Sequence, residues 1–345
     1  MEMNSEILNS KCKGCGSELV YNPKMGCLTC KYCNTNFYLP KKRDDAIVVR
    51  EYSSEFHPSQ LNQALKAYKC MGCGNVYYMS SDEASKQCPN CGMTSSVLDE
   101  DPGFCADGII PFKVTKEQAK SIFEKYLKQE KITLNAKESE LEGVFVPVWN
   151  FMYNVDSSYA ASATELRRYS DGTYYSISKP IYGEKHKRIK SHGVSATTAE
   201  MDEFLTLFDE NDYAGILPYT PEYTYGYKVE TMNKDIHDHY YEITSSAESQ
   251  TKEELSNKIY SSYKDVSNVN IDSRVGDVYF NFTYVPVYIN KYTRKNKIYK
   301  TYISGTTGKT IGHNPTTAKK AFLTLLKVLG VIGLIIFLIL VFKSE

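Results

Sequence analysis

Eight cysteines in the first third of the chain have the spacing of a metal site that occurs twice. They form four C-x-x-C pairs, and the second two pairs repeat the first two after 58 positions (70 − 12 = 58). The eight residues are Cys12, Cys15, Cys30, Cys33, Cys70, Cys73, Cys88 and Cys91. Their neighbours repeat too, because KCKGCG at 11–16 returns as KCMGCG at 69–74. The pattern indicates an internal duplication in which each copy carries four ligands.

Zinc is the metal that suits this arrangement. A C-x-x-C turn places two sulfurs on one side of a tight knuckle, where backbone amides can also point at them. Two knuckles presented by short hairpins complete a tetrahedral tetrathiolate site. Each unit is too small to fold on apolar burial alone, so we expect metal binding and folding to occur together. The sequence therefore predicts two structural Zn²⁺ ions.

Three other uses of the cysteines fit the pattern less well. Disulfides need an oxidising compartment, whereas the topology expected from 321–342, discussed below, places this region in the cytoplasm. A redox C-x-x-C pair usually starts a helix inside a βαβ unit, which this region lacks. A cross-braced pair of sites, as in ubiquitin-ligase modules, is a third alternative, but duplication of a full ligand set favours two independent ribbons. Cys27 is matched by Ser85 in the second copy, and Cys105 has no counterpart, so neither is expected to bind metal.

The elements that would position these sites form a multidomain chain. We expect a first zinc ribbon at 1–40, a linker with a short helix at 41–66, a second ribbon at 67–100, a tyrosine-rich α+β domain at 106–316 and a transmembrane helix at 321–342. The middle domain should be mostly antiparallel β. Of the 29 tyrosines, 22 follow its start, and aromatic side chains pack well on a pleated sheet.

Local signals inside the middle domain predict three helices and a hairpin. Thr115 and Gln118 form a capping box at the start of an amphipathic helix. Further helices are expected at 200–208 and 252–263, and Asp171-Gly172 is a strong hairpin turn.

Two phrases recur in the same order within this domain. IIPF at 109–112 returns as ILPY at 216–219, and VPVW at 146–149 returns as VPVY at 285–288. The repetition suggests a tandem duplication of an α+β unit.

Other candidate motifs point to ordinary structure. GTTGKT at 305–310 is partly similar to a Walker motif, but its glycines are too close and no helix can follow, so a hairpin turn is expected. His237 and His239 alternate onto one face of a possible strand without further metal ligands. No serine, cysteine or paired-carboxylate pattern has catalytic spacing, and we expect no enzyme activity.

The stretch at 321–342 predicts a membrane anchor. It is long enough to cross a bilayer, and lysines flank its N-terminal side, which would keep the bulk of the chain in the cytoplasm. The N-terminus does not resemble a signal peptide. The expectation is a single-pass, tail-anchored protein of the cell membrane.

Charge bears on nucleic-acid binding, which is common among zinc ribbons. The whole chain has 41 basic and 41 acidic residues, and positions 1–105 have 11 against 12. Each zinc with four thiolates adds about two negative charges. Binding to phosphate backbones requires clustered Lys and Arg, so a replication- or transcription-related function is kept only as the alternative.

The order of these motifs resembles a family of bacterial tandem zinc-ribbon membrane proteins, mostly from Firmicutes, encoded beside SPFH (flotillin-like) and phage-shock-protein-A homologues. The resemblance covers nearly the whole chain, from the two ribbons to the SGTTGK turn at 304–309 and the terminal apolar stretch. It implies a membrane adaptor that recruits SPFH and phage-shock-type proteins in the response to envelope damage, without a catalytic residue or small-molecule substrate. A sensor of metal or thiol oxidation is a third hypothesis.

Overall fold

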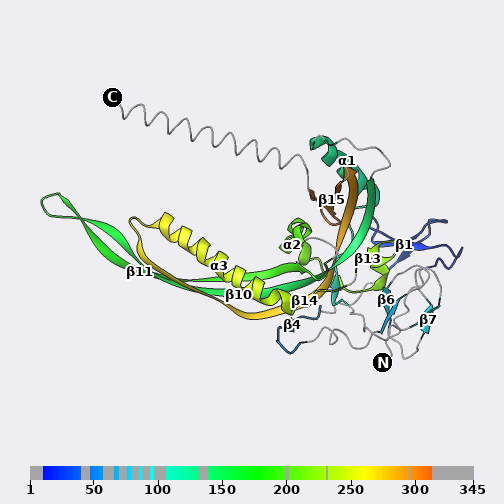
Figure 1. Cartoon of the computed structure of the whole chain (residues 1–345), viewed down its shortest axis with the longest axis horizontal. Helices are drawn as coiled ribbons and strands as arrows, with labels where there is room; N and C mark the ends of the chain where they lie inside the picture. Colours follow the sequence, from blue (N-terminus) through cyan, green and yellow to red (C-terminus); the bar gives the residue numbers. More distant parts are fainter. Residues whose placement is uncertain are drawn as a thin grey trace.

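The part of the chain that the computed structural model describes is organised around one large sheet with a long curved arm (Figure 1). The arm extends away from the cysteine-rich head, and the two lie at opposite ends of the molecule (Figure 1). For the strands between 66 and 96 the description covers the backbone alone. The described residues are 11–39, 47–56, 66–69, 76–79, 85–87, 94–96, 106–130, 132, 139–198, 202–230, 232–294 and 297–312.

Short strands make up the head. A three-stranded antiparallel sheet contains β1 (Leu19–Asn22), β2 (Cys27–Cys30) and β3 (Asn36–Tyr38). Two separate hairpins follow, and their strands are β5 (Lys66–Lys69), β6 (Val76–Met79), β7 (Ser85–Gln87) and β8 (Thr94–Ser96).

The main sheet has nine strands, five of which run in the order β11-β10-β14-β15-β16. Three of them are unusually long, at 30, 22 and 28 residues: β10 (Ser139–Arg168), β11 (Tyr174–Ser195) and β14 (Ser267–Arg294). The other strands are β4 (Arg50–Glu51), β9 (Gly108–Ile109), β12 (Leu217–Pro218), β13 (Lys228–Val229), β15 (Lys297–Ser304) and β16 (Thr310–Gly312).

The helical elements lie against this sheet. They are α1 (Lys116–Gln129), the 3-10 turn η2 (Asp202–Leu207), α2 (Glu210–Tyr213), the 3-10 turn η3 (Pro221–Thr224) and α3 (His237–Ser262). The predicted capping box of α1 is confirmed, because Thr115 accepts from the Gln118 N–H and the Gln118 side chain accepts from the Thr115 N–H. The helix predicted at 200–208 is instead the shorter turn η2 in its described part.

Both faces of the sheet are covered near the head. Phe145, Trp149 and Phe151 belong to one buried cluster, whereas Val146 and Val148 belong to another that includes residues of η2 and α2. Alternate residues of a strand point to opposite faces, so burial on both sides explains the nearly continuous apolar run in this part of β10.

The arm is a thinner structure. One face of β10 and β14 is covered by α3, whose buried residues recur every four positions through Ile243, Ala247, Thr251, Leu255 and Ile259. The predicted Asp171-Gly172 turn joins β10 to β11, and Gly172 has the positive φ of 92° that favours glycine there. The arm therefore has a helix on one side and a hairpin at its tip.

The sheet register relates two halves of this region. The VPVW phrase of β10 lies opposite the VPVY phrase of β14, with Val146 paired to Val285. β9 runs parallel to β14 at Thr283, and β13 runs parallel to β10 at Val144. The contacted positions in β14 and β10 are 139 residues apart (283 − 144 = 139), as the VPVY and VPVW phrases are, but their partners Gly108 and Lys228 are 120 apart, whereas 107 positions separate IIPF from ILPY. The second pair of phrases instead lies side by side, in β9 and β12. The tandem duplication therefore stays a prediction.

The predicted fold class requires correction. The sequence favoured two ribbons, an α+β middle domain and a transmembrane helix, whereas the described part is mostly β-sheet. The balance differs because three very long strands occupy much of the middle domain. Conversely, α3 begins 15 residues before the helix predicted at 252–263 (252 − 237 = 15).

The predicted membrane anchor and single-pass membrane localisation are also contradicted. In the part of the chain that the structure describes, no helix is both long and apolar enough to cross a membrane. α3 would reach about 39 Å, but charged residues such as Glu242, Lys252 and Glu254 recur along it. α1 has only 14 residues. The predicted segment itself, 321–342, lies outside the described residues.

Candidate metal centre

Two turns of the same construction carry the first four cysteines. In the first, the Cys12 carbonyl accepts from the N–H of Gly16, and the Cys12 N–H donates to Ser17. In the second, the Cys30 carbonyl accepts from Asn34, and the Cys30 N–H donates to Thr35. Gly16 and Asn34 have positive φ values of 72° and 56°, conformations that glycine and asparagine adopt most readily. The repeated backbone pattern explains why both pairs present their sulfurs in the same way.

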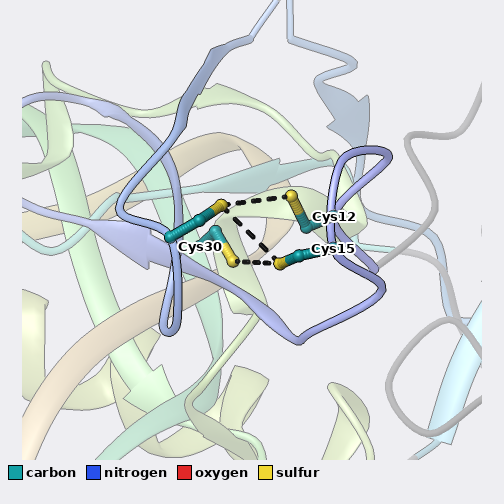
Figure 2. Close-up of side chains that lie close together, drawn as sticks. Cys12, Cys15 and Cys30 are labelled. Carbon is teal, nitrogen blue, oxygen red and sulfur yellow. Dashed lines mark hydrogen bonds between the residues drawn. The ribbon is translucent and has the colours of Figure 1, made fainter.

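The four thiols converge on one point. Figure 2 shows the side chains of Cys12, Cys15 and Cys30 pointing toward one another. Sulfur–sulfur distances are 3.6 Å from Cys12 to Cys33, 3.5 Å from Cys15 to Cys30 and 3.6 Å from Cys15 to Cys33, and all four sulfurs lie within 4.8 Å of one another.

This geometry fits a tetrahedral metal site. Four sulfurs about 2.3 Å from a zinc ion would lie about 3.8 Å apart, close to the spacing observed. A disulfide would bring two sulfurs to about 2.05 Å, and these cysteines are free. The disulfide alternative therefore does not describe this ribbon, and its four cysteines can bind one metal ion.

Backbone amides support negative charge on the sulfurs. The N–H of Gly14 donates to the Cys12 sulfur and the N–H of Tyr32 to the Cys30 sulfur, each at 3.4 Å. Such bonds stabilise thiolates, the form that binds metal.

The thiols also affect one another. The side chain of Thr35, with its backbone N–H, lowers the pKa of Cys33 to about 6. The N–H of Ser17 lowers the pKa of Cys15, but desolvation and the neighbouring thiols outweigh it and raise that pKa to about 12. Four adjacent thiols therefore do not lose their protons independently, and a bound dication would compensate the charge.

β1 attaches the ribbon to η3 and the residues that follow it, just before β13 of the main sheet. The N–H of Tyr21 donates to the carbonyl of Tyr225 at 2.9 Å, and the ring of Tyr21 packs edge-on against Tyr223 at 5.2 Å. Gly226 allows a close approach, since a Cβ there would come within 2.8 Å of Val20. The metal site thus belongs to a module with a defined position on the sheet.

Cysteines outside the cluster differ in their surroundings. Cys27 is fully buried in β2, and its sulfur lies 4.0 Å from the Thr29 hydroxyl. It is not part of the sulfur cluster. Cys105 lies outside the described residues.

The second set of cysteines, Cys70, Cys73, Cys88 and Cys91, also lies outside the described residues. The strands around it nevertheless repeat those of the first ribbon. Moved by 58 positions, β3 becomes 94–96, which are the bounds of β8, and β2 becomes 85–88, which differs from β7 by one residue. Each C-x-x-C pair falls between the two strands of a hairpin. The backbone is thus compatible with a second ribbon.

The other candidate residues lie in structural positions. GTTGKT follows β15 as a turn, in which the N–H of Gly308 donates to the Ser304 carbonyl. His237 and His239 occupy the first turn of α3, so the predicted strand is wrong. His239 is buried, and burial lowers its pKa. GTTGKT is therefore a turn, and the two histidines belong to a helix.

A joint between the linker and the sheet was not predicted. Arg50 in β4 donates to the Asp107 carboxylate at 2.6 Å, and the Asp107 side chain is only 1% exposed. Next to it, the Tyr52 hydroxyl and the Phe56 carbonyl contact the two ring nitrogens of His237 at 2.8 and 2.7 Å. These partners lie 57 or more residues apart, so no local spacing signals them. The joint fixes the linker that follows the first ribbon.

Comparison with known proteins gives a relative without an assigned function. The chain is 23% identical over 327 residues to an uncharacterized protein of Bacillus subtilis (strain 168), YdjG, and the match covers 91% of this chain and 92% of that protein. No family model matches. No solved structure matches either.

Proposed function

We propose that this protein is a zinc-dependent adaptor that binds protein partners and has no catalytic role. The observation that carries the proposal is the cluster of four sulfurs in a ribbon that is hydrogen-bonded to Tyr225, at the end of η3. A zinc ion there would hold the ribbon folded, because so small a unit has little apolar core of its own. The metal would serve as a structural brace for a recognition module.

The overall shape supports an adaptor. The head and the tip of the arm lie at opposite ends of the molecule (Figure 1). β10 alone has 30 residues and curves along the arm (Figure 1). Surfaces at the two ends of the molecule can therefore contact different proteins at once.

A second zinc ion in the ribbon at 67–100 is part of the proposal. Its ligands would be Cys70, Cys73, Cys88 and Cys91, and the repeated strands around them support this assignment. Both ions would be structural.

The partner class comes from the sequence resemblance. We propose SPFH (flotillin-like) proteins and, through them, phage-shock-type proteins in the response to envelope damage. The nearly balanced charge of the head supports protein partners over nucleic acid.

Affinity capture followed by mass spectrometry tests this function. The full-length protein is compared with a variant lacking two ligands, Cys30→Ser plus Cys33→Ser, and with the matched control Cys27→Ser, which changes a buried cysteine outside the sulfur cluster. We expect an SPFH protein to be captured by the intact protein and the control and lost from the ligand variant. Equal capture by all three, or capture of replication proteins that nuclease abolishes, would contradict the proposal.

A further inference from the structure

The outer edge of β11 carries no neighbouring strand in the described part of the chain. β11 ends the strand order of the main sheet, and β10 is its partner along its whole length. η2 and α2 lie near its C-terminal end. From Tyr174 to Val194 no residue is buried. An unpaired edge presents a row of N–H and C=O groups that can pair with another strand.

The tip of the arm has even less support. β10 and β11 stay paired out to Arg168 and Tyr174, whereas β14 leaves β10 at Ser162. One more backbone bond, from the Thr164 N–H to the Lys264 carbonyl, follows. Beyond Thr164 the arm is a two-stranded ribbon, and such ribbons are only marginally stable in water. Its exposed apolar side chains include Leu166 at 60% and Tyr174 at 67%. An added strand would supply the missing neighbour.

The charge on β11 indicates what kind of strand fits. Tyr174–Ser195 contains five basic residues, namely Lys179, Lys185, Lys187, Arg188 and Lys190, and the single acidic residue Glu184. Lys185 and Lys187 share the carboxylate of Glu254 in α3. Arg188 and Lys190 form no ion pair with the described residues. The edge therefore keeps an excess of positive charge.

Two other occupants fit less well. A second β11 would bring like charges together, and like charges opposite one another destabilise a strand pair. β14 of a second copy could also pair with β11 through its first residues, 267–278, which pair only with β10 among the described strands. This stretch contains Asp272 and Asp277, but Asp272 already pairs with Arg274 at 3.0 Å. Single-stranded nucleic acid needs aromatic stacking platforms beside the basic groups. Next to the basic residues at 185–190, Tyr182 is the one aromatic ring of β11 besides histidines, whereas Tyr174 and Tyr175 lie at its far end.

We propose that the outer edge of β11 binds an extended acidic segment of a partner protein as an additional antiparallel or parallel strand. Main-chain hydrogen bonds would supply affinity, and the basic side chains would select an acidic sequence. This inference rests on the proposed adaptor function, for which it identifies one binding surface.

A peptide experiment tests the surface on the zinc-saturated full-length protein. The probe is a fluorescent ten-residue peptide of alternating Glu and Val, compared with a Lys-Val peptide by fluorescence anisotropy. Two further acidic peptides carry N-methyl groups on the odd or on the even residues. The N–H groups of odd and even residues in a strand point to opposite edges, and only one edge would face β11. We therefore expect one of the two N-methylated peptides to lose binding and the other to keep it. Equal binding by both would overturn the proposal.

Protein variants locate the site. Arg188→Glu plus Lys190→Glu should raise the Kd of the acidic peptide about tenfold or more, whereas the charge-matched control Lys252→Glu plus Lys258→Glu in α3 should leave it nearly unchanged. No detectable binding of the acidic peptide would overturn the proposal. The lysines and Pro180 would then serve to prevent this edge from pairing with other strands. Concentration-dependent self-association through β11, or preferential binding of a single-stranded oligonucleotide, would also overturn it. The zinc ligands are intact in all these variants. A negative result for the peptide would therefore rule out this binding surface without deciding the capture test of the adaptor function.

Discussion

Replacing Arg50 with alanine should remove the ion pair between the linker and Asp107, and the resulting loss in the free energy of unfolding should be large and should depend on pH. The Asp107 carboxylate is 1% exposed and has two donors on one oxygen, Arg50 at 2.6 Å and the Phe282 N–H at 2.8 Å. Removing one partner of a buried ion pair typically costs about 3–5 kcal/mol, because a buried charge is left uncompensated. We expect Arg50→Ala to lower the free energy of unfolding by this amount at pH 7.

The sign of the pH dependence follows from Asp107. Burial raises the pKa of this carboxyl above its ordinary value of 3.8, and Arg50 and the Phe282 N–H oppose the shift. Without Arg50 the pKa rises further. Between the unfolded and folded pKa values the native state keeps a proton that the unfolded state has lost, so stability falls as pH rises through that window. The difference in the free energy of unfolding between Arg50→Ala and the unchanged protein should therefore become smaller when the pH is lowered from 7 toward 5.

Tryptophan fluorescence during urea unfolding measures the effect locally. Trp149 is the single tryptophan, fully buried, with its ring 4.8 Å from that of Phe282. With a urea dependence of about 1–3 kcal/mol per molar, the midpoint should fall by about 1 M or more. Arg50→Ala combined with Asp107→Asn should be more stable than Arg50→Ala alone, because the amide carries no charge. A midpoint shift below about 0.3 M would refute this reasoning. So would an equal loss in the free energy of unfolding at both pH values, or a double variant that is no more stable than Arg50→Ala.

Three further predictions concern local structure. Thr115→Ala should cost about 1 kcal/mol and speed hydrogen exchange at the start of α1, since the capping bond to Gln118 is lost; unchanged exchange would contradict it. Asp156→Asn should lower the pKa of His186 in an NMR titration, because the 2.7 Å hydrogen bond and charge of Asp156 raise it, whereas Glu184→Gln should change it less. Gly226→Ala should speed exchange of the Tyr21 amide, since the residue has a φ of 87° and its Cβ would contact Val20; protection like that of the unchanged protein would argue against the docking described.

Local patterns in the sequence were reliable where the chemistry is local. The cysteine spacing predicted a cluster that the structure forms from the first four residues, and the capping box at Thr115 is present with both hydrogen bonds. Each of these features depends on residues that are close in sequence or fixed by a short turn. The same holds for the glycine turn that follows β15.

Features set by distant packing were missed. α3 buries His239, Ile243, Ala247 and Thr251 on one face, and this mixture of polar and small residues gives only a weak apolar period. The alternation of His237 and His239 therefore suggested a strand. The contact of Arg50 with Asp107 joins residues 57 positions apart, and nothing in their neighbourhoods signals it. The predicted membrane anchor rested on hydropathy at 321–342, and no helix in the described residues meets that requirement.

The most direct test of the central claim is X-ray absorption at the zinc edge on protein with one intact ribbon. Changing Cys70, Cys73, Cys88 and Cys91 to serine leaves the first cluster as the remaining candidate site. We predict one zinc ion per chain with four sulfur neighbours at about 2.3 Å, and loss of that ion when Cys30→Ser is added. A site with oxygen or nitrogen in place of two or more sulfurs, or zinc that Cys30→Ser leaves in place, would contradict a zinc-braced ribbon.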